Sequence, residues 1–215
     1  YTEDDCRFYG IMLGDGNISS VNNLAYVALN KDTKKDTIDF VENYLTKMNI
    51  HITYTYVHDK YVRLTWTRTN MFKFTYEMLY DANKEKYVIP NMLHLPKPKI
   101  LNIIKGVLET DGKVKDYQIV LEITSLSIVE SIRYMLLRLG ILTSGSVRDR
   151  RNESHITKYN SLIRNTKISY ILIVPKKQII CDLFKHKNLT TSGSFTFFEY
   201  KGYLFSIVNS NKCIR

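Results

Sequence analysis

The sequence is poor in the residues that build disulfide frameworks and zinc sites. Its 215 residues include three cysteines, Cys6, Cys181 and Cys213, which lie far apart and form no C-x-x-C pair. An odd number of widely spaced cysteines argues against a disulfide-stapled fold and against the common zinc motifs. The five histidines show no metal-ligand spacing either and receive no catalytic role. This cysteine usage predicts an intracellular, reducing compartment and leaves the organelle open.

Long apolar runs are also missing. No stretch approaches the roughly 20 apolar residues that span a bilayer, and no Lys-flanked apolar segment with a small-residue cleavage site opens the chain. A membrane protein is therefore not expected. The chain begins without methionine, so a segment cut from a longer polypeptide is one interpretation.

What the sequence has in excess is positive charge. It carries 31 Lys and Arg against 21 Asp and Glu, a formal net charge of +10 with a pI near 9.4. With 44% hydrophobic residues, a chain of this length can still bury a core as one large or two small domains. The charge suits a polyanionic partner, either nucleic acid or an anionic membrane surface. Because membrane segments are lacking, nucleic acid is favoured.

Two stretches end in the same unusual way. Residues 8–16, "FYGIMLGDG", and residues 104–112, "IKGVLETDG", are apolar, helix-compatible runs that close on Asp15 and Asp111, each followed by glycine. The alternative to a functional motif is a plain helix end, in which glycine supplies a positive φ. A single copy would favour that alternative. Two copies in one basic chain favour a shared function.

The sequence that follows each of these two stretches repeats the same order of expected helices and strands. A helix pattern over 36–50 matches one over 127–141, and a strand pattern over 60–68 matches one over 167–175. The second copy carries an insertion of about 16 residues within 148–167. The expected fold class is α+β, with two pseudo-symmetric αββαββα repeats over 1–82 and 100–190, an irregular linker over 83–99 and a tail over 191–215.

Small residues recur at helical spacing in both stretches. Gly10 and Gly14 are four residues apart, and Gly106 and Thr110 repeat that spacing. A stripe of small residues lets two helix backbones approach closely. We therefore expect the two helices to pack on each other, parallel and around a pseudo-twofold axis, so that their carboxyl-terminal ends emerge together.

Parallel packing would bring Asp15 and Asp111 together. Two like charges repel each other, and the negative ends of two helix dipoles add to the repulsion, unless divalent cations occupy the gap. Mg²⁺ suits such a gap, since it prefers oxygen ligands, uses one or two carboxylates and keeps water and phosphate oxygens in its shell. The pair of acids therefore predicts a magnesium site.

With these two endings, the chain resembles the LAGLIDADG homing endonucleases of the single-chain, two-motif type. The resemblance covers residues 3–190 and departs from the motif spelling at Tyr9, Leu13, Lys105 and Glu109. The final acid is intact twice. The resemblance implies motif helices at the repeat interface, curved antiparallel sheets that form a DNA-binding saddle, and metals held by the final acids. Glu109 is interpreted as a solvated or interfacial acid rather than as a third ligand.

On this resemblance we expect a monomeric, Mg²⁺-dependent endonuclease without an obligate protein partner. It would cut both strands of a long, asymmetric double-stranded DNA site across the minor groove and leave short 3′ overhangs. Asp15 and Asp111 would each hold metal at one strand, with the backbone carbonyls of Gly14 and Thr110 completing the ligand set. Mn²⁺ or Ca²⁺ is expected to fit the same sites.

The family also places a basic residue near each scissile phosphate. In "NKEKYVIP" (83–90), Lys86 fits best, with Lys84 as the alternative, and in "FKHKNL" (184–189) the candidate is Lys187. A solvated surface lysine is the competing interpretation for each of them.

Strand alternation nominates the side chains that face DNA. Over 61–67, Val62, Leu64 and Trp66 form an apolar face that should meet the helices, and the polar residues between them form the other face. The resulting DNA-contact set is Tyr26, Asn30, Tyr61, Arg63, Thr65, Thr67, Gln118, Thr124, Arg148, Arg150, Lys167 and Ser169. The inserted loop adds Arg151, Lys158 and Arg164 as a clamp on the DNA backbone that is mobile without DNA. An ordinary exposed sheet residue is the competing interpretation at each position.

Two further interpretations stay open. The same fold would serve a non-cleaving nucleic-acid-binding protein, either an intron RNA maturase or a DNA-binding regulator, although the presence of both acids favours cleavage. The strand-like tail over 197–211 raises an intein context, yet no splicing cysteine opens the chain and no His-Asn pair closes it.

Overall fold

The computed structural model describes most of the chain. Outside the described residues lie 58–59, 117, 152, 157–161, 165–166, 185–188, 190, 192–195, 201–202 and 208–215; the side chains of 56–57, 155–156, 162–164, 196–200 and 203–207 are likewise not described. Contacts divide the chain into two compact units. The first is Tyr1–Gly112 with Ser125–Met135, and the second is Lys113–Thr124 with Leu136–Arg215.

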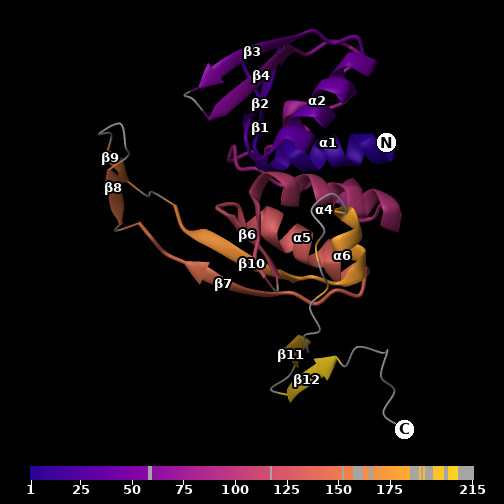
Figure 1. The fold of residues 1–215 in the computed structure, drawn as a ribbon, viewed down its shortest axis with the longest axis vertical. Helices are drawn as coiled ribbons and strands as arrows, with labels where there is room; N and C mark the ends of the chain where they lie inside the picture. Colours follow the sequence, from indigo (N-terminus) through magenta and orange to yellow (C-terminus); the bar gives the residue numbers. More distant parts are fainter. Residues whose placement is uncertain are drawn as a thin grey trace. The chain divides into compact units, whose positions relative to one another are not determined.

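The first unit contains a four-stranded antiparallel sheet and several helices (Figure 1). Its elements are α1 (Glu3–Gly14), β1 (Gly16–Ile18), β2 (Leu24–Asn30), α2 (Lys35–Lys47), β3 (Ile52–Val57), β4 (Tyr61–Thr67), the 3₁₀ helix η1 (Tyr76–Met78), α3 (Pro90–Leu93), α4 (Lys97–Asp111) and most of α5 (Leu126–Arg138). The strand order is β1-β2-β4-β3. A capping box starts α1, because Thr2 and Asp5 satisfy each other's backbone N–H groups.

The predicted apolar face of β4 is confirmed. Val62, Leu64 and Trp66 are buried and lie opposite buried residues of β2 in the ladder. Against them packs Phe8 of α1, whose ring lies 5.9 Å from Trp66 and 4.2 Å from Tyr44 of α2. Alternation thus directs one face of the sheet to α1 and α2 and leaves the other face for polar side chains.

Helices α1 and α4 pack directly on each other, as the small-residue spacing predicts (Figure 1). A Cβ added to Gly10 would lie 2.2 Å from the carbonyl oxygen of Ile103, and one added to Gly106 would lie 2.2 Å from that of Arg7. Neither position has room for a side chain. The helices run parallel, because Asn102 bonds to Glu3 near their amino-terminal ends, while Gly14 meets Thr110 at the other end.

The second unit is built around a second four-stranded antiparallel sheet of the same connectivity. Its elements are β5 (Gly112–Val114), β6 (Gln118–Ile123), the end of α5, β7 (Ser144–Arg148), β8 (Ser154–Ile156), β9 (Leu162–Arg164), β10 (Ser169–Pro175), α6 (Gln178–Leu183), β11 (Thr196–Tyr200) and β12 (Tyr203–Ile207). Its strand order, β5-β6-β10-β7, repeats that of the first sheet. The predicted α+β class with two pseudo-repeats is confirmed.

Three local features differ from the sequence expectation. The insertion within 148–167 is not only a loop, because β8 and β9 pair in it as a short antiparallel hairpin. The last helix of the first repeat is reduced to η1. The linker over 83–99 holds α3 and the start of α4, which begins with prolines at positions where a first helical turn tolerates them.

The contact units do not follow the sequence repeats. Helix α4 belongs to the second repeat but joins the first unit, because it packs on α1 through the glycine contacts. The tail forms a two-stranded hairpin of β11 and β12, in line with its strand-like sequence. In the part of the chain that the structure describes, no helix is long and apolar enough to cross a membrane.

Candidate metal centre and nucleic-acid interface

The two motif aspartates stand at the adjoining ends of α1 and α4. Asp15 is the carboxyl-terminal cap of α1, and Asp111 is the last residue of α4. A Cβ added to Gly14 would lie 2.7 Å from Oδ2 of Asp111 and 2.0 Å from Oγ1 of Thr110. The carboxylate of Asp111 therefore lies against the residue that precedes Asp15. The parallel packing of the helices brings the two acids into one site.

The glycines that follow the two acids, Gly16 and Gly112, are required because a side chain would clash with the preceding helix turn, not because their φ is positive. Within the described residues, positive φ values occur at Asn49, Lys84 and Gly140. A Cβ added to Gly16 would lie 2.5 Å from the Cα of Met12, and one added to Gly112 would lie 2.3 Å from the carbonyl oxygen of Leu108. The chain folds back tightly over each helix end. The plain helix-end interpretation, which relied on a positive φ, does not describe these turns.

Burial and charge act strongly on the acids. Burial raises the pKa of Asp15, and the ammonium groups of Lys34 and Lys86 oppose that rise. Burial, together with the charge of Asp15, raises the pKa of Asp111 to about 7. Burial also lowers the pKa of Lys86 to about 8, against the attraction of both acids. The four side chains form one electrostatic cluster at the helix ends.

Lys86 and Lys34 each bind the carbonyl groups at one helix end. Lys86 Nζ donates to the carbonyl oxygens of Met12 and Leu13 at 3.0 Å and of Gly14 at 2.6 Å. Lys34 Nζ donates to the carbonyl of Thr110 at 2.9 Å and to that of Glu109. The carboxyl end of a helix attracts cations, and these carbonyls have no partner within the helix.

These contacts bear on the predicted ligand set. The carbonyls of Gly14 and Thr110, nominated as metal ligands, accept hydrogen bonds from Lys86 and Lys34 respectively. A carbonyl oxygen has two lone pairs, so each can still bind a second cation. The alternative candidate Lys84 is exposed on a turn.

Lys34 was missed by sequence reasoning. It stands at the amino-terminal cap of α2, far along the chain from the second motif helix whose end it binds. The only local signal is a lysine where a helix usually has a side-chain cap, and Lys34 makes no such cap. Nothing in the periodicity links that position to residues 109–110.

Ser125 and Tyr80 hold the segment that carries Lys86. The hydroxyl of Ser125 donates to the carbonyl of Lys86 at 2.6 Å and accepts from the backbone N–H of Ile128 in α5. Lys86 also pairs with Tyr80 in an isolated antiparallel bridge. The backbone of Lys86 is thus fixed from two sides.

Glu109 is an interfacial acid and its carboxylate is engaged. It is 3% exposed and forms a two-pronged ion pair with Arg7 of α1, with both N–O distances at 2.8 Å. The Arg7 guanidinium in turn lies 3.9 Å from the ring centroid of Phe40. In the described part of the chain, no group of three or more His, Cys, Asp or Glu side chains is arranged to hold a metal. The candidate centre therefore rests on two carboxylates.

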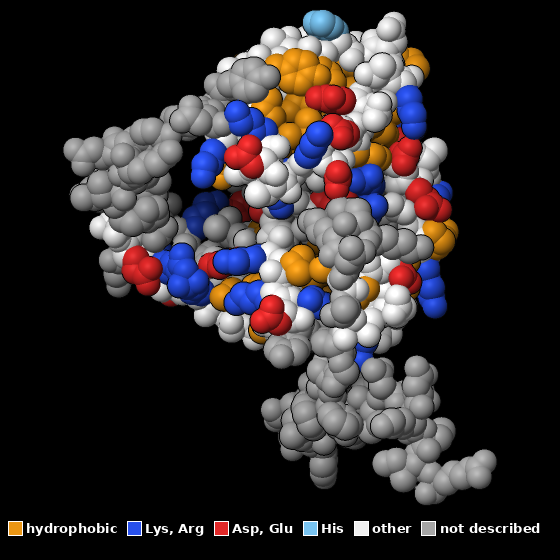
Figure 2. All heavy atoms as spheres, viewed as in Figure 1, with side chains coloured by type: hydrophobic (Ala, Val, Ile, Leu, Met, Phe, Trp, Pro, Cys, Tyr) orange, Lys and Arg blue, Asp and Glu red, His pale blue; other side chains and the backbone are white. Residues whose placement is uncertain are grey.

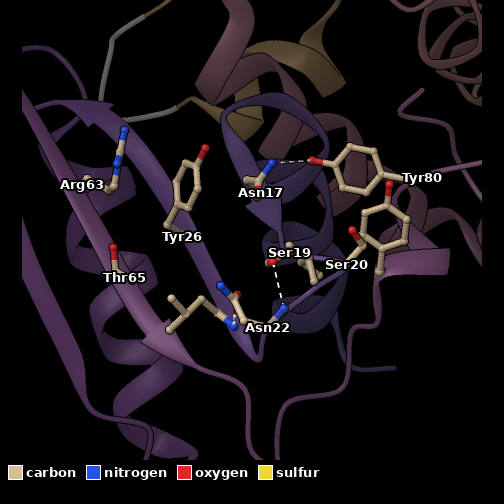
Figure 3. Close-up of a pocket in the computed structure, with 11 residues that line it drawn as sticks. Asn17, Ser19, Ser20, Asn22, Tyr26, Arg63, Thr65 and Tyr80 are labelled. Atoms are coloured by element: carbon tan, nitrogen blue, oxygen red, sulfur yellow. Dashed lines mark hydrogen bonds between the residues drawn. The ribbon is translucent and has the colours of Figure 1, made fainter. Parts of the chain in front are cut away.

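The predicted DNA-contact residues of the first sheet share one face. Tyr26 lies opposite Thr65, and Asn30 lies opposite Tyr61 in the ladder, on the side away from the core. The full set on this face is Tyr26, Asn30, Tyr61, Arg63, Thr65 and Thr67. A cavity of about 520 Å³ opens there, and Figure 3 shows Tyr26, Arg63 and Thr65 projecting toward it from β2 and β4.

The cavity also has a wall that sequence reasoning missed. Asn17 Nδ2 donates to the hydroxyl of Tyr80 at 3.0 Å, and the Tyr80 ring stacks on Tyr76 with their centroids 4.7 Å apart (Figure 3). Asn17 comes from β1, whereas the two tyrosines come from the segment after β4. Only the fold brings them together.

In the second sheet, Arg148 and Ser169 are directly opposite each other and face away from the buried Leu121 and Leu172. Both contact Glu122, which accepts the Ser169 hydroxyl at 2.7 Å and lies 3.7 Å from Arg148. Gln118 shares their side of the sheet by its register.

The remaining candidates lie at the edges of this sheet or outside the described part. Thr124 and Lys167 are exposed beside strand ends. Arg150 lies 3.7 Å from Glu153, and Arg151 lies 2.6 Å from Asp149. Lys158 and Lys187 fall outside the described residues, and the side chain of Arg164 in β9 is also outside them. Figure 2 shows basic side chains interspersed with acidic ones, so net charge alone does not locate an interface.

The raised pKa of Asp111 predicts a pH-dependent stability. Below the ordinary value of 3.8, the carboxyl is protonated in both the folded and the unfolded chain. As pH rises above 3.8, Asp111 loses its proton in the unfolded chain but keeps it in the folded chain. The free energy of unfolding therefore falls with pH until the folded carboxyl also ionises at about pH 7. Asp111→Asn should therefore raise the melting temperature at pH 8 in chelator, by roughly 3–10 °C, and should lose that gain toward pH 4.

Melting curves at both pH values test this expectation, with Asp32→Asn as the control because Asp32 is exposed on the β2–α2 turn. If Asp111→Asn raises the melting temperature as much at pH 4 as at pH 8, the surroundings of Asp111 do not raise the pKa of its carboxyl group.

Comparison with known proteins supports the fold. A family profile described as a LAGLIDADG-like domain matches residues 98–180. No curated protein is similar enough in sequence to match the chain. Mesophilic variants of the homing endonuclease I-DmoI share the fold, with a TM-score of 0.58 and 13% identity over 86% of this chain and 88% of that one.

The structure of I-DmoI in complex with DNA and Ca gives the same values. The N-terminal LAGLIDADG domain of DUF199/WhiA matches with a TM-score of 0.54 and 9% identity, over 87% of this chain and 83% of that one. At these identities the likeness concerns the fold. That fold occurs both in proteins described as homing endonucleases and in one described simply as a LAGLIDADG domain.

Proposed function

We propose that this single-chain LAGLIDADG protein with two motifs is a site-specific, divalent-metal-dependent DNA endonuclease. It would hydrolyse one phosphodiester in each strand of a long, asymmetric duplex site and leave short 3′ overhangs. The observation that carries the proposal is the pair of aspartates at the adjoining ends of α1 and α4. Packing of the two helices alone does not require two half-buried acids that repel each other at the helix ends.

The residues at the helix ends fit a divalent cation. Two carboxylates and two backbone carbonyls supply oxygen ligands, and Mg²⁺ commonly takes few protein ligands and completes its shell with water and phosphate oxygens. Mg²⁺ is the proposed ion, and Mn²⁺ or Ca²⁺ would use the same ligands. Structures of I-DmoI with DNA have been determined with Ca, with Mn and with Mg, which supports this assignment. When bound, the metal would activate water and stabilise the leaving oxygen.

Side chains at the two helix ends would position the metal and the scissile phosphates. Asp15 and Asp111 would anchor metal at the two scissile phosphates, one for each strand. Lys86 and Lys34 would keep one ammonium beside each helix end, where it opposes the charge that builds on an attacked phosphate. Lys187 remains a candidate of the same kind from the sequence.

DNA recognition is assigned to the outer faces of the two sheets, where polar residues alternate with the core residues. Arg148, Arg150 and Arg151 each pair with an acid that is itself exposed or half-buried, so phosphates can replace those acids at low cost. The inserted segment is proposed as a clamp on the DNA backbone. We further propose a monomer that acts in an intracellular, reducing compartment without an obligate protein partner.

A non-cleaving nucleic-acid-binding protein is the second candidate, either an RNA maturase or a DNA-binding regulator. The fold similarity to the LAGLIDADG domain of DUF199/WhiA supports this candidate, because that protein shares the fold and is not described as a homing endonuclease. An intron or an intein context is compatible with either function.

The decisive experiment is selection of cleaved sites from a randomised duplex DNA library. Recovery of one long asymmetric site in Mg²⁺, with no cutting in chelator, is expected. Retention of a specific duplex without cutting in any divalent metal would support the second candidate.

Binding of DNA should depend strongly on salt. Each phosphate that the basic surface contacts releases counterions, so log affinity should fall against log salt with a slope of about −0.9 per contact. For roughly six contacts, affinity would drop about a thousandfold between 50 and 200 mM salt. Fluorescence anisotropy of a labelled target at several salt concentrations measures the slope. A flat response would contradict any nucleic-acid function.

A further inference from the structure

The ends of the two motif helices receive their ammonium groups in different ways. Lys34 stands immediately before α2, and its side chain reaches the carbonyls of Glu109 and Thr110 at the end of α4. Lys86 reaches the end of α1 from the linker over 83–99, in a part of the chain that belongs to no long helix or strand. The position of the Lys86 ammonium therefore depends on the contacts that hold the Lys86 backbone.

Ser125 occupies the place in the second repeat that Lys34 occupies in the first. Lys34 immediately precedes α2, and Ser125 immediately precedes α5, the matching helix, which has 13 residues as α2 does. A serine side chain is too short to reach a helix end as a lysine does. Its hydroxyl instead donates to the carbonyl of Lys86 at 2.6 Å. At this position the second repeat holds the backbone of another residue that carries the ammonium.

The hydroxyl of Ser125 is buried and works as both donor and acceptor. Ser125 is 7% exposed. Its oxygen accepts from the N–H of Ile128 in the first turn of α5 at 3.3 Å, and its only proton goes to the carbonyl of Lys86. A serine that only capped α5 would need the acceptor alone. The donated bond is an additional contact between the start of α5 and the linker.

The Lys86 ammonium has an arrangement that is sensitive to small shifts of its backbone. Its three N–H donors face three carbonyls of the last turn of α1, at 2.6 to 3.0 Å. Beside it, the N–H of Tyr87 donates to the carbonyl of Leu79 at 3.0 Å, which holds the neighbouring peptide. The bond from Ser125 acts on the carbonyl of Lys86 itself. Loss of that bond would let the Lys86 backbone move, and the three ammonium contacts would loosen together.

We propose that Ser125 is a positioning residue for the half-reaction at the end of α1 and that it acts through Lys86. The inference rests on the proposed endonuclease function. Each repeat thus controls the ammonium at the motif helix of the other repeat, directly from Lys34 at the end of α4 and indirectly from Ser125 at the end of α1. Because each helix end would serve one DNA strand, Ser125 and Lys86 act on one strand and Lys34 acts on the other.

The test follows the two strands of the selected duplex separately, with a different 5′ label on each, in single-turnover cleavage by the full chain in Mg²⁺. Ser125→Gly removes the hydroxyl but leaves a residue that is accepted at a helix start. It should slow cleavage of one strand by roughly 10- to 100-fold, because a small misplacement near a reacting group has effects of that size. Lys86→Met should slow the same strand, and Lys34→Met should slow the opposite strand.

A second measurement needs neither DNA nor metal. In chelator, the ¹⁵N-labelled ammonium of Lys86 should give an NMR signal that exchanges slowly with water, because three carbonyls accept its protons. Ser125→Gly should speed up exchange at Lys86 until the signal broadens or vanishes, and should leave the Lys34 signal in place. Ser125→Thr keeps the hydroxyl, so it should retain both signals and cut both strands.

Thr2→Ala is the matched control for the loss of a helix cap. Thr2 caps α1 at the end opposite to Asp15, and its hydroxyl accepts from the N–H of Asp5. This variant should lower the melting temperature, as loss of a cap does, without slowing one strand more than the other.

Three results would overturn the inference: equal slowing of both strands by Ser125→Gly, slowing of the strand that depends on Lys34, or an unchanged Lys86 signal in that variant. If the unmodified chain cuts neither strand in any divalent metal, the proposed function is rejected instead. The ammonium signal would then still decide whether Ser125 holds Lys86 at the end of α1.

Discussion

Asp15→Asn and Asp111→Asn are each expected to lower double-strand cleavage by about a thousandfold or more, because several kcal/mol of transition-state stabilisation depend on the metal that these acids would hold. Asparagine keeps the size of the side chain and removes the charge. Binding of the target should persist, and in chelator it should stay level or tighten, since one of two repelling carboxylates is gone.

Cleavage of the selected target in Mg²⁺ measures the loss, and anisotropy in chelator measures binding. Asp116→Asn provides a matched control, because Asp116 is an exposed acid on the turn between β5 and β6. Full cutting by either motif variant would show that the paired aspartates are not the metal centre, even with the fold unchanged.

Gly10→Ala should destabilise the protein by about 3 kcal/mol or more, although alanine in a helix normally stabilises by about 1 kcal/mol over glycine. The added Cβ would lie 2.2 Å from the carbonyl oxygen of Ile103, and that carbonyl belongs to the backbone of α4 and cannot rotate away. The two motif helices would have to separate. Because their separation sets the position of Asp111 relative to Asp15, cleavage should fall together with stability.

Urea unfolding of the variant tests this expectation. Gly140→Ala is the informative comparison, since nothing lies within 4 Å of its added Cβ but its φ is +73°. That variant should lose only about 1 kcal/mol, which is the cost of a left-handed conformation. Equal losses in the free energy of unfolding at Gly10 and Gly140 would mean that α1 and α4 leave room for a side chain at Gly10.

The acid cluster shows where sequence reasoning works and where it stops. Asp15 and Asp111 are visible in the sequence because each ends an apolar run. The four-residue spacing of Gly10 with Gly14 and of Gly106 with Thr110 correctly predicts that the two runs pack together. The contacts of Lys34 with the second helix end have no such signal. They depend on how the start of α2 is placed relative to the end of α4, which no local pattern encodes.

The strands give the same contrast. Alternation along 61–67 is a local property, and it correctly predicts the buried face of Val62, Leu64 and Trp66. It also places Arg63 on the opposite face. It does not predict that the Arg63 guanidinium lies over the ring of Tyr26, or that Asn17 and Tyr80 form a wall of the cavity beside it.

The sequence by itself determined the shared order of the first helix, the strands and the second helix in both repeats, the core face of β4 and the acids that end the two motif helices. These follow from residue spacing, since periodicities of 3.6 and 2 dictate which side chains share a face. Only the tertiary structure decided the lysine contacts at the helix ends, the burial of Glu109 against Arg7, the hairpin in the insertion and the contact of Arg63 with Tyr26. The reason is that these features join residues distant in the chain, and their free energies depend on burial and distance, which arise only after the elements have packed.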